Sequence, residues 1–296
     1  MTDYGRPLEF GISVAPLADP PGLAAGVARA ADRAGLELVG IQDHPYQRRF
    51  LDTWTLISTL VPVTENVRFF PDVANLPLRP PAMLAKAAAS LDVLSGGRVE
   101  VGLGAGGFWD AIVGMGGPRR SPGEALRSTE EAIRVMRMVW SGERSLRFDG
   151  EFYSLKGMRP GPPPAHDIGV WIGAYGPRML GLIGRRADGW VPSLGYSPPG
   201  RLPQMHKLID EGAAEAGRVP SEIKRIYNVS GTIGPEGEGP LEGPAEKWVE
   251  TLTGFVLEGG MDSFVYWPGE DPERQAELFG REVVPAVREA VERGRS

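Results

Sequence analysis

The strongest constraint on how this chain can fold is a regular alternation of short β-rich runs with amphipathic helical runs. Such alternation predicts parallel strands joined by crossover helices that cover the sheet. The strand-like runs are residues 8–16, 36–42, 67–73, 99–104, 168–173, 188–193, 222–234 and 263–268, and the helical runs that follow them are residues 21–35, 52–64, 80–94, 124–140, 177–187, 202–216, 245–260 and 272–292.

Eight strand-and-helix units fit into 296 residues. A closed (β/α)8 TIM barrel has this number of units and about this length, and it is ordinarily one domain. The sequence therefore predicts an α/β protein with a single TIM-barrel domain over residues 1–296. A doubly wound open sheet is the main alternative.

The alternation is interrupted between residues 142 and 168. Asp149 and Gly150 stand between alternating residues, which is a hairpin signal, and a proline-rich linker follows at residues 160–164. We expect a hairpin-containing insertion in the barrel after the fourth helix, and no boundary between domains.

Three helix ends carry local signals. Ser121, with Glu124 three residues later, predicts a capping box at the start of the fourth helix. Gly96 and Gly97 predict the end of the third helix. Asp271 predicts a side-chain cap for the last helix.

Composition excludes several classes of protein. The chain has no cysteine, so disulfides, thiolate metal sites and a cysteine nucleophile are ruled out. No apolar run reaches the roughly 18 residues that cross a bilayer, and no signal peptide is recognisable, so we expect a cytoplasmic protein without membrane contact. The net charge of −6 is spread over interspersed acidic and basic residues, which argues against a nucleic-acid partner.

The turn after the fifth strand has an unusual charge. The helix predicted to begin at Pro177 carries Arg178 but no carboxylate in its first turn. A cation at this end of a helix costs about 0.3–1 kcal/mol unless an anion lies beside it. Free N–H groups after Gly176 and the guanidinium together predict a phosphate site, and an ordinary connection with an exposed arginine is the alternative.

The chain has three histidines, of which His44 is the best acid/base candidate. It follows Asp43 at the end of the second strand, where a barrel places its chemistry, and an imidazole exchanges protons near pH 7. A histidine that only holds the loop by bonding Asp43 or the backbone is the alternative. His166 and His206 are expected to be solvated and too far apart for a metal site, and no metal is predicted.

Four glycines between residues 102 and 107 follow the fourth strand. No helix opens directly after them and no acidic residue stands at the spacing of a dinucleotide fingerprint, so a Rossmann site is rejected. Small residues here would let a flat ring approach the backbone, with Phe108 and Trp109 as cavity walls. A flexible loop with both aromatic residues tucked beneath it is the alternative.

Several of these segments together resemble the bacterial luciferase-like superfamily of flavin- and deazaflavin-dependent oxidoreductases. The resemblance covers nearly the whole chain, and it rests on the Asp-His pair at 43–44 and on residues 52–69, 76–106 and 173–190. The block SLDVLSGGR, followed by GLGAG, is its most specific part. It implies a TIM barrel with an insertion, a redox cofactor across the barrel mouth and a homodimer through the early helices.

The resemblance also implies which residues bind the cofactor. A non-prolyl cis peptide between Asp72 and Val73 would press on the ring. The ring would be lined by Asp72, Val73, Ala74, Asn75, Gly106 and Gly107, and the phosphate would be held by Gly173, Ala174, Tyr175, Gly176, Pro177, Arg178 and Met179. His44 would serve as proton donor or hydrogen-bond partner with Asp43 as its orienter, and the candidate substrate walls are Tyr46, Phe108, Trp109, Tyr196 and Trp267.

The Asp-His pair resembles the branch that uses the deazaflavin coenzyme F-420, for which hydride transfer with a small organic substrate is expected. Gly107 stands where the sugar-phosphate dehydrogenases of that branch carry a glutamate, so a sugar phosphate is not expected. A monooxygenase that uses reduced FMN and O2 is one alternative. A non-catalytic flavin-binding or partner protein of the same fold is another.

Overall fold

The computed structural model describes residues 3–296 and contains a parallel barrel. Neighbouring strands follow the order β3-β2-β1-β12-β10-β9-β8-β5-β4. A bridge between Phe69 and Val99 joins β3 to the start of β5 and closes the ring, which confirms the TIM barrel and excludes the open sheet. The barrel strands are β1 (Glu9–Val14), β2 (Leu38–Ile41), β3 (Arg68–Pro71), β4 (Ala74–Asn75), β5 (Val101–Gly104), β8 (Val170–Gly173), β9 (Gly189–Trp190), β10 (Lys224–Ile233) and β12 (Ser263–Pro268).

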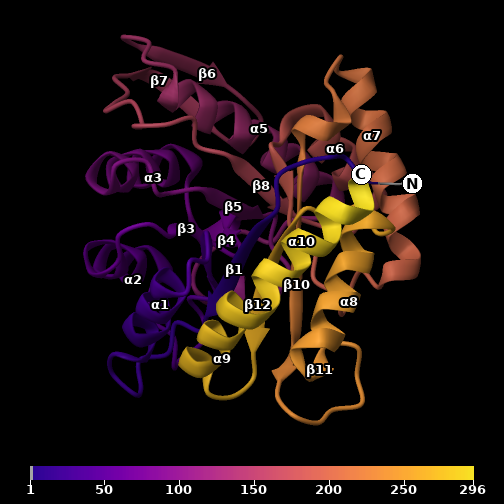
Figure 1. Ribbon diagram of the computed structural model, residues 1–296. Coiled ribbons are helices and arrows are strands. Elements are labelled where there is room, and N and C mark those ends of the chain that lie inside the picture. Colours follow the sequence, from indigo (N-terminus) through magenta and orange to yellow (C-terminus); the bar gives the residue numbers. More distant parts are fainter. Residues whose placement is uncertain (1–2) are drawn as a thin grey trace.

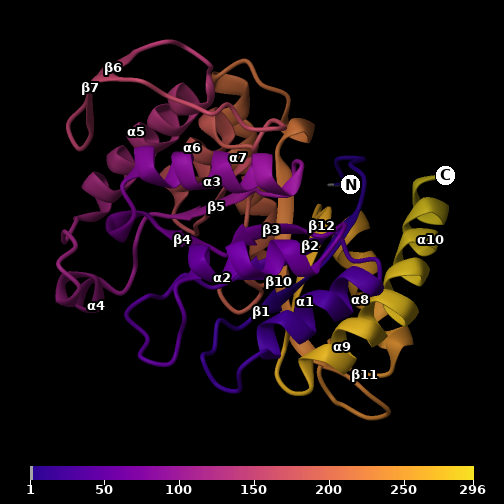
Figure 2. The same ribbon diagram turned by 90° about the vertical axis from the view of Figure 1, so that its left-hand side faces the viewer.

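Helices cover the outside of the barrel (Figure 1). Along one side α1, α2 and α3 lie one above another (Figure 2). A short strand, β11 (Glu242–Gly243), pairs with β10. The helices are α1 (Leu23–Arg33), α2 (Thr53–Leu60), α3 (Pro81–Ser95), α4 (Trp109–Gly114), α5 (Pro122–Trp140), α6 (Pro177–Arg186), α7 (Leu202–Glu215), α8 (Ala245–Leu257), α9 (Pro272–Leu278) and α10 (Val284–Arg295), the last two joined by a π-helical turn (Phe279–Val283).

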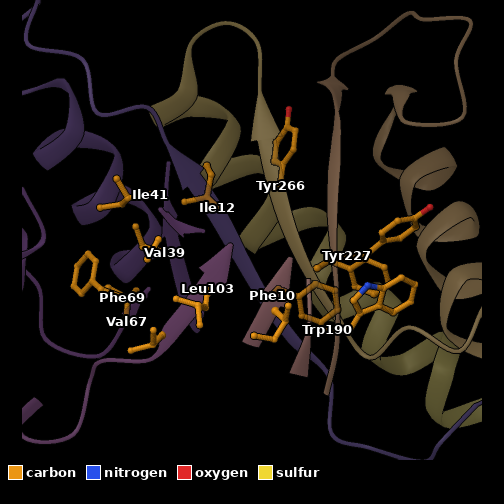
Figure 3. Close-up of a cluster of buried hydrophobic side chains, with 14 of the residues drawn as sticks. Phe10, Ile12, Val39, Ile41, Val67, Phe69, Leu103, Trp190, Tyr227 and Tyr266 are labelled. Atoms are coloured by element: carbon orange, nitrogen blue, oxygen red, sulfur yellow. The ribbon is translucent and has the colours of Figure 1, made fainter. Parts of the chain in front are cut away.

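The strands bury both faces, because alternate residues point into the barrel and out to the helices. On β2, Leu38 belongs to an inner cluster while Val39 packs in the outer core. Figure 3 shows outer-core side chains such as Phe10 and Tyr266 between strands and helices. The inner cluster fills the barrel at mid-height and consists of Leu38, Phe70, Trp171, Val191, Ile226 and Val265.

An ion-pair network lies at the amino-terminal ends of the strands. Arg68 pairs with Glu9 at 2.7 Å and with Glu100 at 2.6 Å, and Lys224 pairs with Glu9. Glu9, Arg68 and Lys224 are the first residues of β1, β3 and β10. Together with the inner apolar cluster, these charges fill the barrel interior toward the amino-terminal ends of the strands, and the cavity described below lies at the carboxyl ends.

Two of the three helix-end predictions are confirmed. The capping box of Ser121 and Glu124 starts α5, and Gly96 ends α3 with a φ of 69°. Asp271 was expected to cap α9 with its side chain, and this is wrong: its φ of 43° is left-handed, whereas a side-chain cap needs an extended residue. Its carbonyl accepts from the Gln275 N–H at 2.9 Å instead.

The predicted hairpin is present in the insertion. β6 (Leu146–Asp149) pairs antiparallel with β7 (Ser154–Met158) in a sheet of its own. The turn is longer than a two-residue Asp-Gly turn, because Gly150 donates to the Tyr153 carbonyl and residues 150–153 form the connection.

Within residues 3–296 there is no helix with the length and apolar character that crossing a lipid bilayer requires.

Candidate active site

A cavity of about 580 Å³ lies at the carboxyl ends of the barrel strands. The barrel rule predicted this location. Most of the predicted site residues line it, and they come from β4, from the ends of β2, β3, β5, β8, β9 and β12 and from the loops beyond them: Asp43, His44, Tyr46, Asp72, Val73, Ala74, Asn75, Gly106, Gly107, Phe108, Gly173, Tyr175, Tyr196 and Trp267.

Six predicted residues lie outside this lining: Trp109, Ala174, Gly176, Pro177, Arg178 and Met179. Trp109 is wrong as a wall of this cavity, because its ring packs under Gly106, where an added Cβ would lie 2.6 Å from its Cη2. Ala174 is buried, and its carbonyl accepts from the Trp190 indole at 2.9 Å. The others begin α6 beside the cavity residue Tyr175.

The start of α6 has the charge pattern that the sequence predicted. Its first turn contains no acidic residue, Gly176 is the N-cap without a side-chain cap, and Pro177 is the first helical residue. Arg178 is exposed, and the ion pairs found within residues 3–296 do not include it. Unpaired N–H groups and a free cation at a helix start are the features that bind phosphate.

The peptide bond between Asp72 and Val73 is cis, as the resemblance implied. It interrupts the third strand between β3 and β4. Gly104 makes room for this bulge, since an added Cβ would lie 2.7 Å from Val73 Cγ2, and Gly173 does the same at 3.1 Å. Gly104 therefore accommodates the Val73 side chain, whereas Gly107 faces open space.

His44 is half-buried, and its environment disfavours the charged imidazolium. Burial lowers the pKa of His44, with the Asp43 charge acting in the opposite direction. Its Nδ1 is 2.6 Å from the Tyr46 hydroxyl, and its ring packs edge-on against Phe108 at 5.4 Å. Burial and the Asp43 charge raise the pKa of Tyr46 to about 12, so the phenol keeps its proton and can donate it to Nδ1. The imidazole then carries its own proton on Nε2.

Asp43 does not orient His44 by a hydrogen bond, and this prediction is corrected. Its carboxylate accepts from Arg79 Nε and Nη2, each at 2.6 Å, and from the Asn75 N–H at 2.9 Å. Arg79 also reaches Asp52, the N-cap of α2, at 2.6 Å. The fork geometry of Arg79 satisfies both Asp43 oxygens. The Asp43 carboxylate therefore joins its own loop to the Asn75 backbone and to the turn that carries Arg79. Tyr46 remains as the hydrogen-bond partner of the His44 imidazole.

Buried polar oxygens lie on the inner wall of the cavity. Asp72, Asn75 and Asn228 are each at most 7% exposed, and all three line the cavity. Asn228 donates through Nδ2 to Asp72 Oδ1 at 3.2 Å. Asp72 Oδ2 and the Oδ1 atoms of both asparagines have no hydrogen-bond partner within residues 3–296. Because buried polar atoms are normally paired, this wall is complementary to a ligand that carries donors.

A family profile described as luciferase-like monooxygenase matches residues 8–238, most of the chain. This chain belongs to the luciferase-like monooxygenase family. The matched range includes the cis bulge, the glycines that face it and the α6 turn.

Curated relatives and solved structures agree with this assignment. A 5,10-methylenetetrahydromethanopterin reductase from Methanolobus tindarius is 30% identical, with 92% of this chain and 78% of the relative covered. An F420-dependent glucose-6-phosphate dehydrogenase from Kineococcus radiotolerans is 25% identical, with 96% and 98% covered. The structure of an F420-dependent secondary alcohol dehydrogenase in complex with an F420-acetone adduct has a TM-score of 0.85 at 21% identity, over 95% and 99% of the chains.

Sequence reasoning missed Asn228 and Arg79. Asn228 could have been found from the two-residue period of β10, in which Lys224, Ile226 and Asn228 point into the barrel. Arg79 carries no such signal, because it lies in a turn and reaches Asp43 only through the tertiary fold.

The prediction that His206 is solvated is wrong. His206 is 1% exposed, and its Nε2 donates to the Gly259 carbonyl at 2.8 Å while Nδ1 accepts from Arg225. Burial lowers the pKa of His206 to about 3. His166 is partly exposed and bonds Asp92 of α3 at 2.8 Å, so it fastens the segment after the proline-rich linker to that helix. Apolar spacing alone does not reveal such buried polar partners.

Proposed function

We propose that this protein is an oxidoreductase that transfers a hydride between coenzyme F-420, a deazaflavin, and a small organic substrate. The observation that carries the proposal is the cavity itself, in which a cis bulge, an open glycine and a half-buried neutral histidine face one space. Membership of the luciferase-like family supports redox chemistry. The name of the Kineococcus relative supports F-420 as the cofactor.

The residues present fit such a cofactor. Gly173, Tyr175, Gly176, Pro177, Arg178 and Met179 would hold a phosphate at the start of α6, where the helix end carries no acidic residue. The ring would lie beside the Asp72–Val73 bulge with Ala74, Asn75, Gly106 and Gly107 around it. When bound, the deazaflavin supplies the hydride chemistry, and the protein orients it and keeps water away.

His44 would act on the substrate as a proton donor or hydrogen-bond partner. Its pKa is lowered by burial, so at neutral pH the ring is uncharged, and the Tyr46 hydroxyl on Nδ1 leaves Nε2–H as the available donor. Asp43 would keep the strand end in place through Arg79. Tyr46, Phe108, Tyr196 and Trp267 would form the substrate walls.

A monooxygenase that uses reduced FMN and O2 is the second candidate, and the description of the matching family favours it. Both candidates need the same phosphate turn and ring wall. They differ in the ring that binds and in whether O2 is consumed.

The cofactor can be decided by titration. We expect oxidised F-420 to bind and its fluorescence to be quenched, with FMN binding at least about tenfold more weakly, a difference of about 1.4 kcal/mol. Tight FMN binding and O2 consumption by the reduced complex would favour the monooxygenase. Binding of neither would point to a non-catalytic or partner protein of the same fold.

The proposal also covers the domain organisation, oligomeric state and cellular location of this enzyme. We propose that residues 1–296 act as one domain, with an insertion at about 142–168, in a cytoplasmic homodimer. Sedimentation of the purified protein would test the dimer. The expected partner is a small molecule, without nucleic acid or membrane.

A further inference from the structure

The two nitrogens of the His44 ring have different surroundings. The Tyr46 hydroxyl oxygen lies 2.6 Å from Nδ1, whereas Nε2 has no hydrogen-bond partner in the protein within residues 3–296. The two nitrogens of an imidazole point in different directions, so a substrate that bonds to Nε2 leaves the Tyr46 contact intact. One nitrogen is thus held by the protein, and the other is open to a ligand in the cavity.

Packing fixes the position of the Tyr46 hydroxyl. The rings of His44 and Tyr46 meet edge to face with centroids 5.5 Å apart, and Phe108 packs against them at 5.4 and 5.9 Å. Asp43 cannot take over the role of Tyr46, because Arg79 binds both oxygens of its carboxylate. Among the described residues, Tyr46 is therefore the group that can exchange a proton with Nδ1.

We infer that Tyr46 acts on the proposed reaction through His44: its hydroxyl holds the ring in the Nε2–H form and lends a proton to Nδ1 while Nε2 gives its own proton to a substrate oxygen. Tyr46 is then a positioning residue, and its hydroxyl does more than line the cavity. This inference rests on the proposed function. It takes the hydride acceptor to be a carbonyl carbon, whose oxygen needs a proton.

The step balances for a carbonyl compound. A hydride, with its two electrons, passes from the reduced cofactor to the carbonyl carbon, and the C=O π pair moves to oxygen. That oxygen takes the Nε2 proton of His44 while Nδ1 takes the Tyr46 proton. Once the alcohol has left, Nε2 takes a proton from water and Nδ1 returns its proton to Tyr46. The second hydrogen of the reduced deazaflavin, on a ring nitrogen, is released to water as a proton, so no net proton is consumed.

The relative acid strengths favour this direction of proton transfer. Burial and the Asp43 charge raise the pKa of Tyr46 to about 12, so the hydroxyl holds its proton at neutral pH. A phenol with this pKa is still a much stronger acid than the alcohol that forms from a carbonyl compound. Without Tyr46, loss of the Nε2 proton would leave the neutral His44 ring as an anion near the Asp43 charge.

The first test reads the His44 ring in the protein alone. Nitrogen-15 NMR of the three histidines shows which ring nitrogen carries the proton. In Tyr46→Phe the fraction of His44 with the proton on Nδ1 should rise about fivefold, because a hydrogen bond is lost while the aromatic packing stays. An unchanged fraction would overturn the inference.

Tyr153→Phe is the matched control for this measurement. It removes a hydroxyl that also takes part in one hydrogen bond, with Arg120 at 3.3 Å, but Tyr153 lies outside the cavity lining. The His44 signals should be the same in this variant as in the wild type. If Tyr153→Phe shifts the proton as much as Tyr46→Phe does, the effect is not due to the contact with Nδ1 and the inference is refuted.

The second test follows oxidation of reduced F-420 by cyclohexanone, acetophenone and benzaldehyde. Tyr46→Phe should lower kcat about thirtyfold with less than a threefold change in KM and in F-420 affinity, whereas loss of a substrate wall would raise KM. Tyr153→Phe should keep the wild-type values. If none of the three carbonyl compounds oxidises reduced F-420, carbonyl reduction is wrong and the inference falls with it.

A double substitution separates action through His44 from direct contact with the substrate. Because Tyr46 acts through the imidazole, adding Tyr46→Phe to His44→Ala should cause no further loss of kcat. If the two losses multiply, Tyr46 acts independently of His44 and the proposed proton transfer is refuted.

The proposed function and this inference fail in different ways. If F-420 does not bind but Tyr46→Phe moves the His44 proton, the proposed function is wrong and the pairing of Tyr46 with His44 stands. If F-420 binds and is turned over while Tyr46→Phe keeps the wild-type kcat, the cofactor assignment stands and the role of Tyr46 is wrong.

Discussion

Arg79 holds both carboxylate oxygens of Asp43, through Nε and Nη2 at 2.6 Å each, beneath the loop that carries His44. Asp43 is almost fully buried and Arg79 is mostly so. The position of the candidate catalytic histidine thus depends on an ion pair from a different loop, between the third strand and α3.

Replacement of Arg79 by alanine should lower the free energy of unfolding by about 3 kcal/mol, because it leaves the Asp43 charge buried without a partner. Urea denaturation followed by circular dichroism measures the change. Arg127→Ala, which breaks the exposed pair with Glu151, is the control and should leave stability nearly unchanged. Equal effects of both substitutions would show that the buried pair has no special role.

His44→Ala should reduce turnover about 10²- to 10³-fold with less than a threefold change in F-420 affinity, because the imidazole is proposed to act on the substrate. Turnover is followed as the loss of reduced F-420 in the presence of an oxidising substrate. A parallel loss of cofactor affinity would indicate that His44 only supports the loop.

Arg178→Ala should weaken F-420 and FMN binding about tenfold or more, because a hydrogen bond to a charged group is worth about 1.5–3 kcal/mol. Its exposed position predicts an unchanged melting temperature. Arg185→Ala, in the last turn of the same helix, keeps the helix start intact and serves as the comparison. Unaltered affinity in the Arg178 variant would contradict the phosphate site.

Because of Asp72, the free energy of unfolding of the wild type should decrease as the pH rises. Burial raises its pKa to about 7 in the folded protein, above the ordinary 3.8 of the unfolded chain, so ionisation of the folded state is penalised as pH rises from about 4 to 7. Asp72→Asn removes this penalty. Relative to the wild type, the variant should gain stability with rising pH, by on the order of 4 kcal/mol at pH 8, and reach a plateau above pH 7. Denaturant titrations at pH 4 and pH 8 compare the two proteins, and a constant difference would contradict the assignment.

The barrel and its mouth were predictable because they follow from periodicity. Runs such as residues 36–42 and 222–234 predict strands, and the ends of parallel strands meet at one edge. The capping box at Ser121 depends on neighbours in sequence, so it was predictable too. The resemblance, and no spacing rule, supplied the cis bond at Asp72.

What the sequence did not reveal are contacts between distant segments. Arg79 and Asp43 are 36 residues apart, and the Asp72 and Asn228 pair spans 156 residues. Trp109 follows Phe108 directly, yet one ring packs under Gly106 and the other lines the cavity, because the start of α4 turns them in different directions. Side-chain direction at a helix start depends on backbone angles that composition does not specify.

Gly104 has a consequence for how this enzyme can diversify. Because a methyl group there would collide with Val73, this position behind the proposed ring cannot change without moving the bulge. New specificities would have to arise at the rim, at positions such as Phe108 and Tyr196, where a changed side chain meets solvent or ligand before it meets the barrel wall.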